Sequence, residues 1–442
     1  MTGREEQLNT LNEHAASGAG NLTILYGRPG IGKTTLIREF LKDHEAFYFE
    51  AVSGADFELR SCMARAAGQE AFEGYGELFS ALLSRGLRIF IFDEFQNIVK
   101  NDAEFMPQVA SLVRSSVDKV MVICVCSSVS WVENAMVRAI GAAAFAINTF
   151  MKLKEFSYMD MVNAFPNCDA KTVLSIYAVT GGVPRYVAMW DGRASFRENV
   201  CRLFLAQDGA LRKEAEQYIR EEFRETGVYF TILHCLASNR NKLNEIHEYT
   251  GYGRDKISVY LKNMIDREIV EKVFSYDIGG NENTKKGLYR IRERFVAFWF
   301  AYIYPHAGIL SVTEPEDFYD RFIAPTVSAS RQEAYEQVAC EFLQIMNEMG
   351  RLGGRYEFKG GWYGKKGNLE LVFAGEKGDS LIGRVFVKEE PVTREELDKT
   401  LELKELSGLK GEKVYLFSLS GFTDDLMGLA DERLGLVDIR DL

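Results

Sequence analysis

The sequence lacks three features that would assign it to a specialised class of protein. It contains no uninterrupted run of about 18 apolar residues, so we expect no membrane-spanning helix. The polar first residues, MTGREEQLNTL, lack the apolar centre of a signal peptide, and we therefore expect a cytoplasmic protein. Its seven cysteines lack pairs at metal-ligand spacing, which favours buried, reduced thiols over a zinc site.

Basic charge is also scarce. The chain has 53 Lys and Arg residues against 64 Asp and Glu residues, which gives a net charge of -11. This balance excludes binding to nucleic acid through a uniformly basic surface, although a local basic face remains possible. A chain of 442 residues, 47% of them apolar, exceeds one compact core and predicts two to four globular domains.

The clearest motif lies near the start of the chain. The segment NLTILYGRPGIGKTTLIREFL predicts a strand, a glycine-rich loop and a helix, and its loop matches the pattern G-x-x-x-x-G-K-[ST]. In this pattern backbone N–H groups and the helix N-terminus hold phosphates, Lys33 reaches the β- and γ-phosphates, and Thr34 ligates Mg²⁺. A chance glycine-rich turn is the alternative. The residues predicted to bind ATP here are Gly27, Arg28, Pro29, Gly30, Ile31, Gly32, Lys33, Thr34 and Thr35.

Two further apolar runs end in polar residues. Ile89 to Phe92 is typical of a strand buried on both faces of a parallel sheet, and it leads into Asp93 and Glu94. We predict that Asp93 holds Mg²⁺ through water and that Glu94 polarises the water that attacks the γ-phosphate, the alternative being an acidic helix cap. The run KVMVICVCSS ends in Ser127 and Ser128. Their hydroxyls are predicted to sense the γ-phosphate or the water, although serine is also common in turns and caps.

Together, GREEQL, GRPGIGKTTL, FIFDEFQ, CSS and TGGVPRYV resemble the archaeal-type ATPase family, a branch of the P-loop NTPases related to AAA+ and STAND proteins. The resemblance implies a parallel sheet with helices on both faces, a helical lid, and ATP with Mg²⁺ as ligands. It also implies that Arg185, in GGVPRY, approaches the γ-phosphate, unless it is a surface arginine. Relatives carry a GR pair before the lid where this chain has AMVRAIG. Arg138 is the remaining candidate for that arginine, which leaves efficient hydrolysis and self-association as open predictions.

The middle of the chain predicts three short helices followed by two strands, which is the pattern of a winged helix-turn-helix. If the third helix enters a major groove, one of its faces would contact DNA, and the hairpin would meet phosphate. A contact with another protein or with the lid is the alternative, because acidic residues interrupt this face. The DNA-facing residues would be Arg254, Lys256, Ser258 and Lys262, with Lys285 and Lys286 in the hairpin.

The last segment predicts a helix, three strands, a helix and a strand, an order that resembles restriction-endonuclease-like nucleases. The ATPase family often ends in such a domain, of uncharacterised function. Glu336 and Glu370 match acidic positions of active members, but Arg384 and Phe386 stand where a metal-binding Glu and a water-orienting Lys belong. Shifting the register to reach Lys388 puts Phe386 at the acidic position. We therefore predict an inactive domain that serves as scaffold.

These observations predict an α/β multidomain protein. The predicted domains are an ATPase core (1–150), a helical lid (151–222), a winged helix (223–305), a connector (306–330) and a degenerate nuclease-like domain (331–442). The predicted function is a Mg²⁺-dependent ATPase that acts as a nucleotide-controlled switch. The alternatives are an ATP-regulated DNA-binding protein and an ATP-dependent nuclease.

Overall fold

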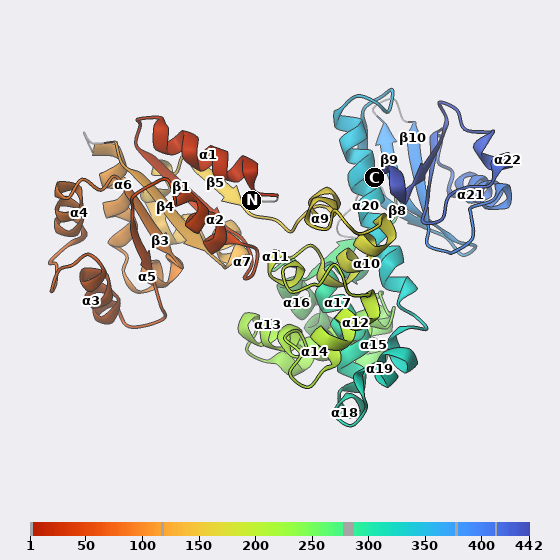
Figure 1. Cartoon of the computed structure of the whole chain (residues 1–442), viewed down its shortest axis with the longest axis horizontal. Helices are drawn as coiled ribbons and strands as arrows, with labels where there is room; N and C mark the ends of the chain where they lie inside the picture. Colours follow the sequence, from red (N-terminus) through yellow and green to blue (C-terminus); the bar gives the residue numbers. More distant parts are fainter. Residues whose placement is uncertain (1–2, 116–118, 277–286, 376–378, 412) are drawn as a thin grey trace. The chain divides into compact units, whose positions relative to one another are not determined.

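The computed structural model describes residues 3–115, 119–276, 287–375, 379–411 and 413–442 (Figure 1). Two compact units make up the chain. The first contains residues 1–156 and 183–185, and the second contains residues 157–182 and 186–442. The five domain boundaries expected from the sequence stay predictions. None of the helices in the described part of the chain is long and apolar enough to cross a membrane.

The first unit is built on a parallel five-stranded sheet with the order β2-β3-β4-β1-β5. Its central strands β1, β3 and β4 are buried along their whole length, as expected for strands covered on both faces. The strands are β1 (Asn21–Tyr26), β2 (Phe47–Glu50), β3 (Ile89–Asp93), β4 (Met121–Cys126) and β5 (Thr149–Lys152).

Alternation along the strands explains the two helical layers. In β3, Phe90 and Phe92 face one apolar cluster, whereas Ile89 and Ile91 face the other. Helices α1 (Glu5–Ala16) and α2 (Lys33–Phe40) cover the isoleucine side. The phenylalanine side is covered by α3 (Asp56–Ala66), α4 (Tyr75–Ser84), α5 (Gln96–Asn101) and α6 (Phe105–Ser115). The predicted parallel sheet with helices on both faces is confirmed.

The second unit begins with helices. These include α9 (Tyr158–Ala164), α10 (Ala170–Thr180), α12 (Phe196–Val200) and α13 (Glu214–Glu222). Three helices and an antiparallel hairpin then follow in the order expected from the sequence: α14 (Thr226–Ala237), α15 (Leu243–Thr250), α16 (Arg254–Ile265), β6 (Val270–Val273) and β7 (Leu288–Ile291). Lys285 and Lys286 lie outside the described residues.

The segment from 306 to 330, predicted to be a connector, is largely helical, and its role as a connector stays a prediction. It holds α18 (Ala307–Leu310), α19 (Pro315–Phe318) and a helical turn (Tyr319–Ile323), and it follows α17 (Arg294–Phe298). Helices of four residues span barely one turn, so they show no 3.6-residue repeat in the sequence. The long helix α20 (Ser328–Glu348) also begins inside this segment.

A second five-stranded sheet, with the order β12-β11-β10-β9-β8, closes the chain. Strands β8, β9 and β10 are antiparallel, and β10, β11 and β12 are parallel. Helix α20 packs on one face through Tyr335 and Phe342, which contact Phe417, while α21 (Arg394–Ser407) and α22 (Asp424–Met427) join the cluster on the other. The strands are β8 (Tyr356–Tyr363), β9 (Asn368–Gly375), β10 (Ser380–Phe386), β11 (Lys413–Ser418) and β12 (Leu434–Asp438).

Candidate nucleotide-binding site

The loop between β1 and α2 depends on glycine at two positions. Gly30 has φ +79° and Gly32 has φ +95°, in the left-handed region that residues with a Cβ rarely adopt. Gly30 also lies against Arg185, because a Cβ at this glycine would lie 3.2 Å from the Arg185 Cβ. The loop therefore has the curled backbone that the phosphate-loop pattern predicts.

Lys33 lies inside this loop. Its Nζ donates hydrogen bonds to the carbonyl oxygens of Gly27 (2.7 Å) and Arg28 (3.1 Å). Burial lowers the pKa of the Lys33 ammonium, and the charges of Glu94 and Asp93 oppose that shift. The ammonium thus sits between the loop carbonyls and two carboxylates, within the cradle that would receive a phosphate.

The other loop residues are divided between the interior and the surface. Pro29, Thr34 and Thr35 are exposed, and Ile31 is buried in the cluster under α2. Arg28 is buried, with its Nη1 3.8 Å from the Glu155 Oε1. The two threonine hydroxyls at the start of α2 are therefore accessible to a ligand from solvent.

Asp93, at the end of β3, is held by two donors. Its Oδ2 accepts a hydrogen bond from the Tyr48 hydroxyl (2.9 Å), and its Oδ1 accepts one from the Glu94 N–H (2.9 Å). Burial raises the pKa of the Asp93 carboxyl, and the bond from Tyr48 opposes that rise. Tyr48 lies on β2, so this contact depends on the pairing of β2 with β3. The sequence carried no signal for Tyr48.

Glu94 has an unusual backbone and two side-chain partners. Its φ of +52° is uncommon for a residue other than glycine, and such outliers cluster at functional sites. One carboxylate oxygen accepts a hydrogen bond from the Ser127 hydroxyl at the end of β4, and the other accepts one from the Gln96 side-chain amide on α5. The adjacent ends of β3 and β4 thus bring Glu94 and Ser127 together. Gln96 was missed by the sequence analysis.

Arg185, Ser128 and Arg138, the remaining residues predicted for the site, lie in different surroundings. The Arg185 N–H donates to the Gly30 carbonyl (3.1 Å), so α11 (Pro184–Val187) begins against the loop. Ser128 precedes α7 (Val129–Trp131), and its N–H donates to the Cys126 sulfur (3.4 Å) rather than to an acidic residue. Arg138 is exposed on the short helix α8 (Val137–Ile140), outside the cluster formed by Lys33, Asp93, Glu94 and Ser127.

Residues 1–190 match an ATPase domain found predominantly in Archaea. Residues 1–190 belong to this family of archaeal ATPases. In addition, residues 299–398 match a family of archaeal and bacterial proteins of unknown function. The predicted resemblance is therefore confirmed.

One relative of this ATPase, an uncharacterized protein of Methanocaldococcus jannaschii, is 28% identical over 383 residues, covering 84% of this chain and 83% of its own. Among solved structures, the Walker-type ATPase of Pyrococcus abyssi matches 68% of this chain and 96% of its own, with 16% identity and a TM-score of 0.49. The ORC2 protein of Aeropyrum pernix matches 70% of this chain and 94% of its own, with 16% identity and a TM-score of 0.45.

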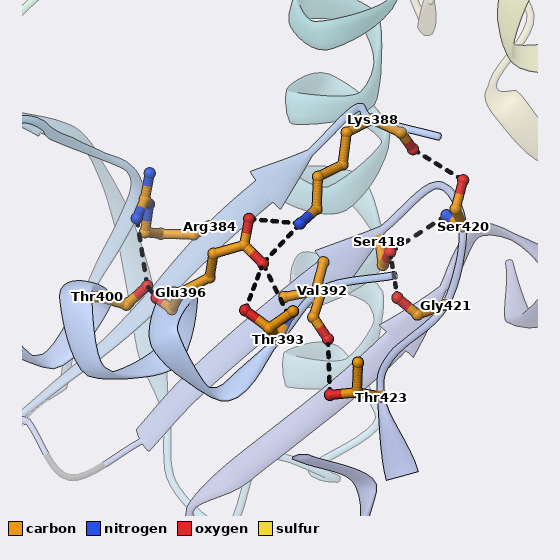
Figure 2. Close-up of polar contacts among 10 residues, drawn as sticks. All are labelled: Arg384, Lys388, Val392, Thr393, Glu396, Thr400, Ser418, Ser420, Gly421 and Thr423. Carbon is orange, nitrogen blue, oxygen red and sulfur yellow. Dashed lines mark hydrogen bonds and ion pairs between the residues drawn. The ribbon is translucent and has the colours of Figure 1, made fainter. Parts of the chain in front are cut away.

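This ATPase has a second set of acidic residues, in its C-terminal sheet. Glu370 on β9 lies beside Arg384 on β10, with 3.6 Å between the Arg384 Nε and the Glu370 Oε2. Burial raises the pKa of Glu370 to about 7, and Arg384 opposes that rise. Figure 2 shows the Arg384 guanidinium directed toward Thr400, to whose hydroxyl it donates at 3.3 Å. A cation therefore lies at the position where the predicted nuclease-like pattern would require a metal-binding acid.

Lys388 also has a partner in the C-terminal sheet. Its Nζ donates to both carboxylate oxygens of Glu396, at 2.6 and 2.7 Å (Figure 2). Glu396 in turn accepts a hydrogen bond from the Thr393 N–H (2.8 Å), which completes a capping box at the start of α21. Lys388 thus binds a helix terminus.

The third acidic residue, Glu336 on α20, is paired with the hairpin. Its Oε2 lies 3.4 Å from the Arg290 Nη1 on β7, and its Oε1 accepts from the Gln332 amide (3.3 Å). Burial raises the pKa of Glu336, and Arg290 opposes that rise. Within the described ranges, no group of three or more His, Cys, Asp or Glu residues is arranged to hold a metal ion.

Proposed function

We propose that this protein is a Mg²⁺-dependent ATPase that acts as a nucleotide-controlled switch. The observation that carries the proposal is the meeting of four polar groups at one edge of the first sheet: the Lys33 ammonium in the loop, Asp93 and Glu94 after β3, and the Ser127 hydroxyl after β4. In open α/β sheets, ligands bind beyond the carboxyl ends of the strands, which is where these groups lie.

Each group takes one role in this proposal. The N–H groups of residues 27–35 and the N-terminus of α2 bind the phosphates of ATP. Lys33 exchanges its two carbonyl partners for phosphate oxygens. Glu94, whose carboxylate is held by two neutral donors, polarises the attacking water. Ser127 fixes Glu94. Ser128 is assigned to sensing the γ-phosphate because it follows the end of β4, and Arg138 is assigned to it on the family resemblance alone.

The residues at this edge fit a magnesium ion. Mg²⁺ prefers hard oxygen ligands, which the exposed Thr34 hydroxyl and the Asp93 carboxylate supply. Bound there, Mg²⁺ neutralises charge on the β- and γ-phosphates. Tyr48 orients the Asp93 carboxylate by its hydrogen bond.

A route from the nucleotide to the rest of the chain begins at Arg185. This arginine lies against Gly30, and the ring of the next residue, Tyr186, is tilted against Phe295 of α17 with 4.2 Å between ring centroids. Arg294, adjacent to Phe295, pairs with Glu333 of α20. We propose that a displacement of Arg185 by the γ-phosphate moves α17 and α20, because a ligand shifts an equilibrium only by contacting one state better than the other.

We propose that the C-terminal sheet is an inactive nuclease-like scaffold. Its two acidic positions support this, because Glu370 is paired with Arg384 and Glu336 is paired with Arg290. Lys388, the nearby lysine, is bound to Glu396. The positive charge of the two guanidinium groups disfavours a divalent ion beside the acidic residues. An ATP-dependent nuclease therefore receives no support from the geometry.

DNA binding by the winged helix is a second candidate function. Arg254, Lys256, Ser258 and Lys262 are exposed on α16, which favours it. The hairpin, however, is engaged by the C-terminal sheet: Ser275 forms a β-bridge with Gly361, and its hydroxyl accepts from the Tyr363 N–H (3.3 Å). DNA binding would therefore depend on α16, because this end of the hairpin is in contact with β8 of the C-terminal sheet.

The test is steady-state ATP hydrolysis by the full chain, with Mg²⁺ or with EDTA, and with or without duplex DNA. We expect turnover that requires Mg²⁺ and that falls about 10²-fold or more in Glu94→Gln. Glu58→Gln, an exposed position on α3, is the matched control and should hydrolyse ATP normally. Mg²⁺-dependent turnover that survives Glu94→Gln would refute the mechanism, and stimulation by DNA would favour the second candidate.

A further inference from the structure

Gln96 has a polar group that the proposed roles leave unexplained. The residue begins α5, is 6% exposed, and donates a hydrogen bond from its Nε2 to Glu94. Its Oε1 is buried and accepts no hydrogen bond from any of the residues that the structure describes. A buried carbonyl oxygen without a donor is costly, so such a group in a native protein calls for a partner such as a water or a ligand.

The orientation of the amide follows from its neighbour. An ionised carboxylate only accepts hydrogen bonds, so the nitrogen of the Gln96 amide must face Glu94 and the oxygen must face away from that bond. The two ends of one amide are about 2.3 Å apart, so the unsatisfied oxygen lies no more than about 5 Å from the Glu94 oxygen that Gln96 binds, a distance that one water can bridge. A water placed there can donate one hydrogen to each residue.

We propose that Gln96 is a catalytic residue whose Oε1 accepts a hydrogen bond from the water that attacks the γ-phosphate. This inference rests on the proposed ATPase function. The water donates one hydrogen to Glu94 and the other to Gln96, which leaves an oxygen lone pair free to face phosphorus. As the new O–P bond forms, the bond from the γ-phosphorus to the bridging oxygen breaks and its electron pair leaves on ADP. Glu94 takes one proton of the water, and Gln96 neither gains nor loses one.

The hydrogen bonds of Gln96 and Ser127 to Glu94 allow the proposed role of Gln96 to be distinguished from the role of Ser127. The Ser127 hydroxyl and the Gln96 Nε2 each hold one oxygen of Glu94, so both fix the carboxylate. Only Gln96 adds an acceptor beside it. If Gln96 did no more than hold Glu94, its loss would resemble the loss of Ser127. A role in orienting water predicts a larger loss for Gln96.

The experiment compares Gln96→Met with Ser127→Ala in the full chain. Methionine has nearly the volume of glutamine and removes both hydrogen-bonding groups. We expect kcat to fall about 10²-fold or more in Gln96→Met and clearly less in Ser127→Ala. The Kd for Mg·ATP, measured with a fluorescent ATP analogue, should stay within about twofold of the wild-type value, since the Gln96 side chain donates its hydrogen bond to Glu94 and not to the loop.

A second variant covers the case in which Gln96→Met alters the fold. Gln96→Asn keeps both polar groups but draws the oxygen back by one methylene, and a displacement of about 1 Å in a reacting geometry costs up to about 10²-fold in rate. We expect at least a tenfold loss of kcat with unchanged Kd and thermal midpoint. Turnover within threefold of wild type in either folded variant, or parallel losses in kcat, affinity and thermal midpoint, would overturn the assignment. Wild-type protein without turnover would overturn the proposed hydrolysis itself.

Discussion

Replacing Glu370 with glutamine is expected to change the pH dependence of stability in the C-terminal sheet. Burial raises the pKa of Glu370 to about 7 from its usual value of 4.5. Because the folded-state pKa lies above the unfolded one, stability falls as pH rises through this interval and is constant above it. A shift of this size corresponds to about 3 kcal/mol, at about 1.4 kcal/mol for each pKa unit. Glutamine stays neutral and removes this dependence.

The assay is hydrogen exchange of peptides from β9 and β10, corrected for the intrinsic exchange rate at each pH, in wild type and Glu370→Gln. The comparison removes the contributions of all other titrating groups. Between pH 5 and pH 8.5 the opening free energy of the wild type should fall by about 2.5 kcal/mol relative to the variant. Glu357→Gln, at an exposed position on β8, is the matched control and should follow the wild type.

The contact with Arg384 opposes the effect of burial on the pKa of Glu370, so the prediction fails if this contact is the stronger of the two. At 3.6 Å, the guanidinium favours the charged form of Glu370 and opposes burial. A difference that stays flat within about 0.5 kcal/mol over this range would mean that Glu370 ionises normally in the folded state and that the ion pair outweighs desolvation.

Three further outcomes follow from named contacts. Although burial raises it, hydrogen bonds from Lys388 and Thr393 hold the pKa of Glu396 below its usual range, so Lys388→Met should lower stability by roughly 1 kcal/mol at pH 7. In calorimetry that difference should disappear as pH falls through the folded pKa. Tyr48→Phe removes a hydrogen bond that lowers the pKa of Asp93, so this pKa should rise. The acidic limb of the pH–rate profile for ATP hydrolysis should therefore move to higher pH. Tyr276→Phe, a change beside the C-terminal apolar cluster, is the control and should leave that limb in place. Arg290→Ala leaves a buried carboxylate and should cost about 3 kcal/mol, much of it recovered in the double variant with Glu336→Gln, as measured by denaturant unfolding.

The sequence predicted the phosphate loop and the ends of β3 and β4 because that chemistry lies in contiguous residues. Lys33, Asp93 and Glu94 are each recognisable from their neighbours in the chain. Tyr48 is not, because its contact with Asp93 exists only once β2 pairs with β3, 45 residues away. Gln96 lay inside the motif FIFDEFQ, yet its role depends on a side-chain orientation that residue type alone does not specify.

Short elements account for most of the fold that the sequence did not predict. Strands β2 and β5 have four residues each, and α18, α19 and α22 are single turns, too brief for a period to be recognised. Strand β12 follows the same loop-rich stretch as α22 and was missed with it. The pairing of Arg290 with Glu336 joins β7 to α20, so no local pattern could have indicated that Glu336 already has a cationic partner.

The two sheets of this protein differ in what surrounds their acidic residues, and this difference determines which of them is suited to phosphate chemistry. Glu94 is held by a hydroxyl and an amide, neutral donors that orient a carboxylate and leave its charge to act on water or on a cation. Glu370 and Glu336 each face a guanidinium, whose positive charge disfavours a metal ion beside them. Restoring metal binding in the second sheet would therefore require removing both arginines. Arg290 also ties β7 of the hairpin to α20 through Glu336, so the same change would weaken the attachment of the hairpin to that helix.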